Sequence, residues 1–357
     1  MAEPSTKDNA WVIFDRIISD AAPSGQYTNP WVVDNAGRRY EPDIPTLELL
    51  LGVPLYLRAT VRSGVRALAL DVWLAYELRR AGFDPNAVWP RAEHPRILPV
   101  PVSNLLDALP KPERARLLAR LTRKSAIAGV TSSSASILGK NYLKQVDVIM
   151  TDWATGPEVL ISTKRMDSSY GKNAPNRVEE SYGDAKNLRL RHPMAALGFL
   201  IALRSDILTK EPLVFDWLSD LVGKLGREDD AYHATCLVLM DYGDDLALAE
   251  EEGDDEEPED PLADAGVEIE HDDYDLEPVP RSDVELAVAA LPAVAVRDEL
   301  VESPLRRGVF LASLVERTLD ATPVNLHREA RSRRKNPRLI SGLANVSDHA
   351  PVDGAAE

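Results

Sequence analysis

The chain has few of the residues that form disulfides, metal sites or membrane spans. Its 357 residues include one cysteine, Cys236, and six histidines without metal-ligand spacing. One cysteine cannot form an internal disulfide or a cysteine-rich zinc site, which excludes a disulfide-stapled secreted scaffold. No uninterrupted apolar stretch reaches the roughly 18 residues of a membrane span, and the first residues lack a signal-peptide layout. We therefore expect a soluble cytoplasmic protein with no membrane partner.

The motifs of several enzyme classes are also missing. The sequence contains no phosphate-binding glycine loop and no dinucleotide fingerprint, so no built-in ATP motor is expected. The serines within 132–136 lack the G-x-S-x-G context of a serine nucleophile, and Cys236 lies inside an apolar run typical of a protein core. Serine and cysteine nucleophiles are therefore not expected.

The formal net charge of −17 is unevenly distributed along the chain. Residues 241–277 hold 19 Asp and Glu and no Lys or Arg, so removing this segment from the total leaves +2 on the rest. Residues 111–191 hold 15 Lys and Arg against 8 Asp and Glu. The acidity therefore belongs to one segment, and the basic middle of the chain favours a nucleic-acid partner.

The middle of the chain has the pattern of an α/β fold. Two short β-branched runs flank the turn D-W-A-T-G-P and predict a hairpin. A helix, a buried strand, an amphipathic helix and a second buried strand are expected to follow. The six elements are predicted at 146–150, 159–163, 176–190, 194–203, 212–225 and 234–242. Their order implies a sheet covered by helices.

The rest of the chain divides by composition. Residues 21–46 read as loop and 83–102 as extended connection, while 64–81, the segment opened by Pro112, 282–300 and 304–320 read as helices. The acidic run cannot bury enough apolar surface to order itself, which predicts a linker. The expected division is a helical and loop region (1–105), an α/β core (106–242), an acidic disordered linker (243–280), a helical region (281–340) and a tail (341–357).

Two charged residues mark one end of the predicted hairpin. Asp147 stands at the start of its first strand and Lys164 at the end of its second, and these ends are neighbours in an antiparallel pair. Side chains alternate along a strand, so Ser162 and Lys164 project to the same face. A carboxylate binds Mg²⁺ through oxygen, and a cation beside it offsets phosphate charge. This arrangement suits phosphodiester hydrolysis.

The run D-V-I-M, a turn, then V-L-I-S-T-K resembles the core of the PD-(D/E)xK restriction-endonuclease-like superfamily, closest to its Mrr-like and type II branches. The resemblance covers about 143–205 and implies a mixed sheet flanked by helices, with Asp147 and Lys164 at the two motif positions. Ser162 departs from the usual Glu, Asp or Gln. Some restriction enzymes carry Ser-x-Lys there and take the missing carboxylate from the next helix, where this chain has Glu179 and Glu180.

The resemblance thus implies a catalytic set of Asp147, Ser162, Lys164, Glu179 and Glu180, with Asp147 and Glu179 as metal ligands. Mg²⁺ is the expected cofactor and Mn²⁺ an alternative. Each residue also has an ordinary structural explanation: an Asp can open a strand at a turn, a Lys can end one at the surface, and acids are favoured in the first turn of a helix. Both interpretations stay open on the sequence alone.

Residues 165–177 are predicted to form a loop that contacts DNA. The segment mixes cations with neutral donors, which suits phosphates and base edges. The candidate DNA-binding residues are Lys140, Lys144, Arg165, Lys172, Asn173, Asn176 and Arg177. A polar loop that caps the following helix explains the same composition equally well.

The function expected from these observations is Mg²⁺-dependent hydrolysis of double-stranded DNA by an endonuclease of restriction or phage defence. A homodimer is expected if both strands of a palindrome are cut, because protein symmetry mirrors site symmetry. The alternative is a non-catalytic nucleic-acid-binding or adaptor protein on a nuclease-like scaffold. Ser162 supports this alternative, because it leaves the motif without its second carboxylate.

Overall fold

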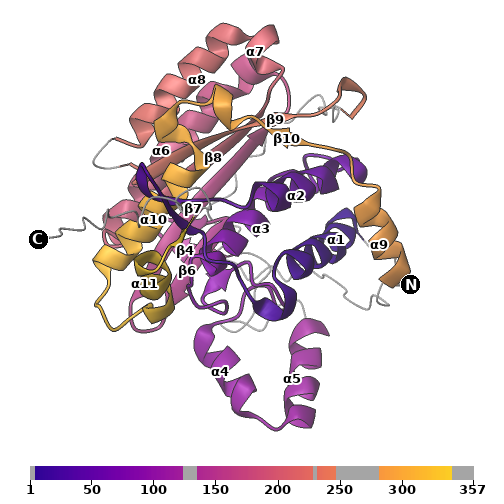
Figure 1. The fold of residues 1–357 in the computed structure, drawn as a ribbon, viewed down its shortest axis with the longest axis vertical. Helices are drawn as coiled ribbons and strands as arrows, with labels where there is room; N and C mark the ends of the chain where they lie inside the picture. The colour runs from indigo at the N-terminus through magenta and orange to yellow at the C-terminus, as the bar shows by residue number, and fades with distance from the viewer. Residues whose placement is uncertain (1–4, 124–134, 228–230, 247–280, 340–357) are drawn as a thin grey trace, which may run out of the picture.

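The computed structural model describes residues 5–123, 135–227, 231–246 and 281–339, and its centre is a six-stranded mixed sheet (Figure 1). The strand order is β10-β9-β8-β7-β6-β3. Strands β7, β8 and β9 are parallel, whereas β6 and β10 run antiparallel to their neighbours. The strands span Val88–Trp89 (β3), Val148–Asp152 (β6), Gly156–Met166 (β7), Ala196–Arg204 (β8), Ala234–Asp241 (β9) and Ala295–Val296 (β10).

Helices cover both faces of this sheet, which explains why its central strands are apolar throughout. All nine residues of β8 are buried. Helices α1 (Thr6–Ala21), α2 (Ile44–Tyr56), α3 (Val65–Arg80) and α10 (Arg307–Ala321) belong to the core on one face. Helices α6 (Tyr170–Arg191) and α8 (Pro212–Leu225) pack on the other.

The alternation of side chains along β7 decides which residues can reach which helices. Val159 and Ile161 enter the core shared with α3, whereas Leu160 and Met166 enter the core shared with α6. Ser162 and Lys164 have the parity of Leu160 and lie on the α6 face, and Thr163 lies on the α3 face. Asp147 directly precedes β6 and lies outside its alternation, since Val146 and Ile149 both enter the α6 core while Val148 enters the α3 core.

Smaller elements surround the sheet. Strand β1 (Trp31–Asp34) pairs with β2 (Gly37–Tyr40) and β11 (Arg338–Leu339), and β4 (Ser136–Leu138) pairs with β5 (Leu143–Gln145). The remaining helices are α4 (Val100–Ala108), α5 (Lys111–Arg123), α7 (Ile207–Lys210), α9 (Arg281–Ala289) and α11 (Arg328–Lys335). Short 3-10 turns occupy Pro23–Gly25, Asp244–Leu246, Asp298–Leu300 and Ser303–Leu305.

The structure confirms an α/β fold, with the predicted hairpin, both buried strands and the helix at 212–225 in place. Three local predictions are wrong. Residues 21–46 are not a loop, because they contain β1, β2 and the start of α2. The helix expected over 282–300 ends at Ala289, and β10 follows it. The DNA-contacting loop is largely ordered, because β7 continues to Met166 and α6 already begins at Tyr170.

The sheet also draws on segments outside 106–242, because its two edge strands are β3 and β10. Most of the predicted acidic linker, at 247–280, and the predicted tail lie outside the described residues. Within the described part of the chain, no helix combines the length and apolar character that a bilayer crossing requires.

Candidate active site

The start of β6 and the end of β7 meet as the sequence predicts. The register pairs Val148 with Ile161, which places Asp147 beside the continuation of β7. The backbone N–H of Thr163 donates to Oδ2 of Asp147 over 2.7 Å. A hydrogen bond from a backbone N–H fixes the direction of a carboxylate and favours its charged form. Asp147 is thereby held beside Thr163, the residue between Ser162 and Lys164.

Lys164 belongs to a charged cluster whose central group is the Glu180 carboxylate of helix α6. Its Nζ donates to Oε1 of Glu180 over 3.1 Å. The same carboxylate receives Lys144 Nζ at 3.7 Å and Arg177 Nη1 at 3.6 Å. Three cations therefore converge on one carboxylate, next to the strand end that holds Asp147. Partial burial alone would raise the pKa of Glu180, but the three cations outweigh it and lower this pKa.

The structure selects between the two candidate glutamates. Glu180 faces the sheet and pairs with Lys164, whereas Glu179 is exposed to solvent. Adjacent residues of a helix point about 100° apart, so only one of them can face the strand. Glu180 is therefore the one of the two that contacts Lys164, and a metal-binding role for Glu179 stays a prediction.

A further carboxylate, Asp184, joins the cluster one turn after Glu180. Lys144 Nζ lies 3.1 Å from its Oδ2, and the hydroxyl of Tyr142 donates to its Oδ1 over 3.3 Å. Burial raises the pKa of Asp184, while Lys144 opposes the change. The sequence analysis missed this residue, although its spacing of four residues from Glu180 places both on one helix face.

The β4–β5 hairpin brings Lys144 and Tyr142 to α6 through Asn187. The side-chain amide of Asn187 accepts from Asn141 N over 2.9 Å and donates to Tyr142 O over 3.2 Å. Gly139 is required at this turn, because a Cβ there would lie 2.1 Å from Nδ2 of Asn187. The predicted DNA-binding residue Lys144 is thus part of the charged cluster.

Tyr232 closes the inner side of the cluster. Its hydroxyl donates to the backbone oxygen of Ser181 over 2.9 Å. Burial raises the pKa of Tyr232 well above its usual value, and the charges of Asp184, Asp147 and Glu180 add to the effect, while a hydrogen bond with Ser162 opposes it. The charges of the three carboxylates therefore all act on one buried phenol.

The predicted DNA-binding residues differ in their position and exposure. Lys172, Asn173, Asn176 and Arg177 occupy the first two turns of α6 at spacings that place them on one stripe, and this stripe leads to Glu180. Lys140 is exposed in the β4–β5 turn. Arg165 does not fit its predicted role, because its side chain is only 1% exposed and pairs with Asp167 at 2.9 Å.

The carboxylates of the cluster could supply some of the ligands of a magnesium ion. Among the described residues, no group of three His, Cys, Asp or Glu side chains is placed to hold a metal ion. Mg²⁺ does not require such a cage, because it is usually held by one or two carboxylates while water and substrate phosphate complete the octahedron. Glu180 pairs with Lys164, Asp184 lies one turn further along the same helix, and Asp147 is bonded to the strand residue before Lys164.

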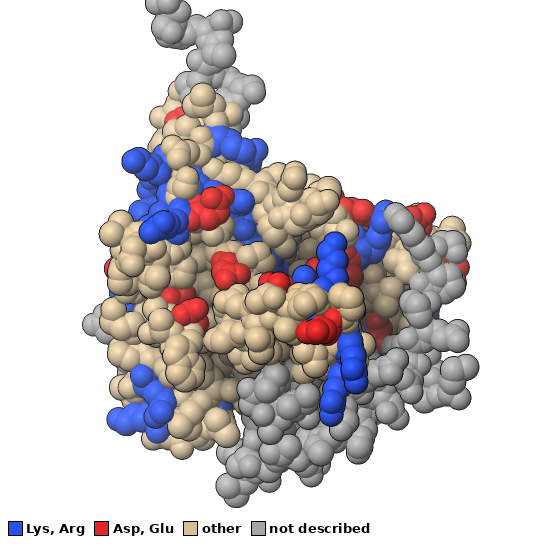
Figure 2. All heavy atoms as spheres, turned by 90° about the horizontal axis from the view of Figure 1, so that it is seen from below, with Lys and Arg blue, Asp and Glu red and all other residues tan. Residues whose placement is uncertain are grey.

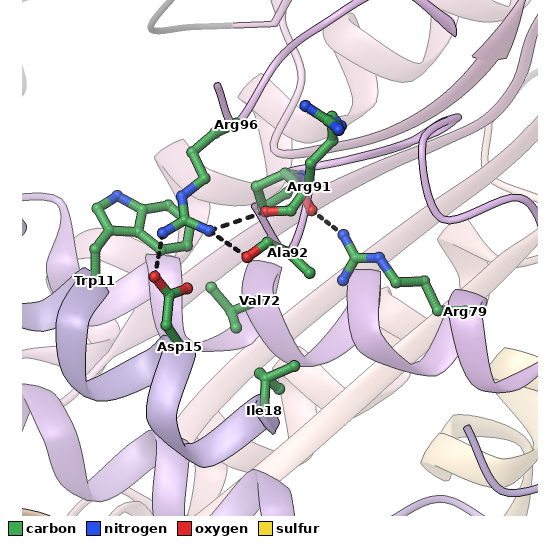
Figure 3. A pocket seen from close by; sticks show the side chains of 9 residues that line it. Trp11, Asp15, Ile18, Val72, Arg79, Arg91, Ala92 and Arg96 are labelled. Atoms are coloured by element: carbon green, nitrogen blue, oxygen red, sulfur yellow. Dashed lines mark hydrogen bonds and ion pairs between the residues drawn. The ribbon is translucent and has the colours of Figure 1, made fainter. Parts of the chain in front are cut away.

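A separate small pocket lies between α1, α3 and residues 90–96 (Figure 3). The guanidinium of Arg96 fills part of it: it lies 4.0 Å from the ring centre of Trp11 and 2.6 Å from Asp15. It also donates to the backbone oxygens of Arg91 and Ala92. These contacts join the 90–96 segment to α1, so the pocket belongs to the packing of the N-terminal helices.

Comparisons of the chain with protein-family models, with curated proteins and with solved structures find no match.

Proposed function

We propose that the protein is a Mg²⁺-dependent endonuclease that hydrolyses phosphodiester bonds of double-stranded DNA. The observation that carries the proposal is that the N–H of Thr163 holds Asp147, while the next residue of the strand, Lys164, pairs with Glu180. A fixed carboxylate beside a cation is the arrangement that metal-assisted phosphodiester hydrolysis needs. The proposal includes restriction or phage defence as the setting.

The side chains divide the chemistry between them. Asp147 and Glu180 would hold the metal ion, which when bound supplies Lewis-acid polarisation of the scissile phosphate. The ammonium of Lys164 orients the attacking water and offsets the charge that develops on phosphorus oxygens. Ser162 offers a hydroxyl donor on the same face. If Glu180 held the metal, its ion pairs with Lys164, Lys144 and Arg177 would weaken, and these cations would be available to the phosphates of DNA.

The DNA path begins on the α6 stripe of Lys172, Asn173, Asn176 and Arg177, which ends at the proposed catalytic cluster. A second basic surface is available on α5. The exposed side chains of α5 include Lys111, Arg114, Arg116 and Arg120. With α4, this helix projects from the body of the molecule (Figure 1), and Lys and Arg side chains protrude at several places in the view from below (Figure 2). Such surfaces neutralise phosphates without reading sequence.

A cleavage assay tests the proposal. Purified protein is incubated with unmodified and methylated plasmid and linear DNA, with Mg²⁺, with Mn²⁺ and with a chelator. We expect metal-dependent cleavage that is lost in Asp147→Ala and in Lys164→Ala, and retained in Lys224→Ala, an exposed lysine of α8 paired with Asp220. Cleavage that survives in both site variants, or that needs no metal, contradicts the assignment. Sedimentation with and without a palindromic substrate tests the proposed homodimer.

A second candidate function is nucleic-acid binding without cleavage on the same scaffold. The observation that favours it is the saturation of Glu180 by three cations, together with the absence of a carboxylate at Ser162. In that case the cluster is a structural ion-pair network, and such networks also shift pKa values. Binding of DNA by the unmodified protein, with no cleavage under any metal or modification state, supports this function instead.

A further inference from the structure

Helix α3 places a buried carboxylate directly behind the candidate active site. Asp71 is 8% exposed, and its Oδ1 accepts a hydrogen bond from the hydroxyl of Thr163 over 2.6 Å. The two residues are 92 positions apart in the chain. Within the described part of the chain, Asp71 forms this hydrogen bond but no ion pair. Burying a carboxylate without a cation partner is unfavourable, so its presence on α3 calls for a reason.

The reason lies in the two hydrogen bonds that Thr163 makes. Its hydroxyl points through the α3 face of the sheet to Asp71, while its backbone N–H donates to Asp147 over 2.7 Å. Thr163 stands between Ser162 and Lys164, so the orientation of this one residue sets the direction of both neighbours. We infer that Asp71 is a positioning residue of the active site, which fixes Thr163 so that its N–H holds Asp147 in place.

Helix α3 is rigidly joined to this part of β7, which makes it a suitable support. The Arg165 side chain donates to the backbone oxygen of Arg66 over 3.5 Å, and the Arg66 guanidinium lies 3.9 Å from Asp167. Arg165, Arg66 and Asp167 are all nearly inaccessible to solvent. Three links therefore tie α3 to the last residues of β7, and Asp71–Thr163 is the one nearest to Asp147.

The buried position of Asp71 disfavours the charged form of its carboxylate. Burial raises the pKa of Asp71 well above its usual value, and the charge of Asp147 adds to the effect. An apolar residue at this position would avoid the cost but would leave the Thr163 hydroxyl without its acceptor. The retention of an acid here is explained when it orients the strand residue on which Asp147 depends.

The inference rests on the proposed function, and its test separates the two. Asp71→Ala and Thr163→Val remove the hydrogen bond, while Asp71→Asn and Thr163→Ser keep an acceptor and a hydroxyl. The control is Glu77→Ala, which removes another buried carboxylate of α3, one bound to Arg80 and Tyr40. For all five variants, kcat and KM for DNA cleavage are measured beside the hydrogen-exchange protection of the residue-163 amide in uniformly ¹⁵N-labelled protein.

We expect Asp71→Ala and Thr163→Val to lower kcat by about tenfold or more with little change in KM, and to reduce the exchange protection of the residue-163 amide. Asp71→Asn and Thr163→Ser restore both values, and Glu77→Ala lowers stability without selectively exposing this amide. Unchanged exchange at Thr163 in Asp71→Ala overturns the positioning role, whether or not the protein cleaves DNA. Faster exchange in a protein that cleaves no DNA supports the positioning role and contradicts the nuclease function.

Discussion

The Nζ of Lys164 lies 3.1 Å from Oε1 of Glu180, and this contact joins the last part of strand β7 to the middle of helix α6. The pair has the geometry of a salt bridge, and Lys144 and Arg177 extend it into a network. A network of this kind can serve stability, catalysis or both. Substitutions at individual members of the network separate the two roles.

Lys164→Ala is expected to reduce the rate of DNA cleavage by about 100-fold or more, because it removes the cation that offsets charge on the reacting phosphate. DNA binding measured with Ca²⁺ in place of Mg²⁺ is expected to change little, since most of the proposed phosphate contacts lie on α6 and α5. A single-turnover cleavage assay beside a fluorescence-anisotropy titration checks both. Equal losses in binding and cleavage would assign Lys164 to the DNA interface instead.

Glu180→Ala and Glu179→Ala form a matched pair on one helix. Glu180→Ala is expected to lower cleavage by about 10- to 100-fold and to shift the Mg²⁺ concentration required for activity upward, because a proposed metal ligand is lost. Glu179→Ala is expected to retain both values, since this side chain is exposed. Metal titrations of cleavage decide. A larger effect at Glu179 would contradict the proposed ligand set.

Asp71→Asn is expected to change how stability depends on pH. The pKa of Asp71 is raised in the folded protein, so its stabilising protonation is complete below the ordinary value of 3.8 and is lost as pH rises through the higher folded-state pKa. Asn cannot ionise. The variant should therefore melt at a higher temperature than the native chain at neutral pH, with a difference that shrinks toward about pH 4.

Thermal unfolding of Asp71→Asn and of the native chain across this pH range measures the difference directly. A gap in melting temperature that stays constant with pH would show that Asp71 does not titrate within the range. Comparison with Glu77→Gln, at the other buried carboxylate of α3, shows whether the effect is particular to Asp71.

Gly139→Ala is expected to displace the β4–β5 hairpin, because the added Cβ would overlap the Asn187 amide. The displacement moves Lys144 away from Asp184 and Glu180, so both the melting temperature and the cleavage rate should fall. Gly183→Ala is the control: no atom lies within 4 Å of its new Cβ, and alanine in a helix is favoured over glycine by about 1 kcal/mol. Equal stability of the two variants would argue against this anchoring.

Lys172→Ala is expected to weaken DNA binding by a similar factor for every sequence and to reduce the slope of log affinity against log salt by about 1. Lys224→Ala, in the last turn of α8, is the control. Salt titrations of binding affinity check the prediction. An unchanged slope would show that the α6 stripe does not contact phosphates.

The sequence predicted the hairpin and the positions of Asp147 and Lys164, because alternating apolar residues and a turn are local signals. The choice between Glu179 and Glu180 could not be made from neighbouring residues in the sequence. It depends on how α6 is rotated against the sheet, which the packing of Leu188 and Ala185 decides. Arg165 and Lys172 look alike in the sequence, but only the parity of β7 shows that Arg165 reaches a buried Asp167.

Asp71 could not be found from the sequence at all, since nothing in its neighbourhood links it to a residue 92 positions later. Its contact arises because α3 packs across β6 and β7. Residues 165–177 misled for a different reason. Pro175, Gly171 and four asparagines or serines in this segment favour turns, yet the helix includes Pro175 because the tertiary contacts of Tyr170 and Ala174 outweigh local preference.

Strand β11 pairs in parallel with β1, so that Val32 lies beside Arg338. During synthesis, the N-terminal hairpin must therefore wait for residues made more than 300 positions later before its open edge is covered. Closing so long a loop slows folding, and an uncovered edge invites pairing with other chains. A chain that ends before residue 338 would lack β11, so the edge of β1 would stay unpaired in such a truncated chain.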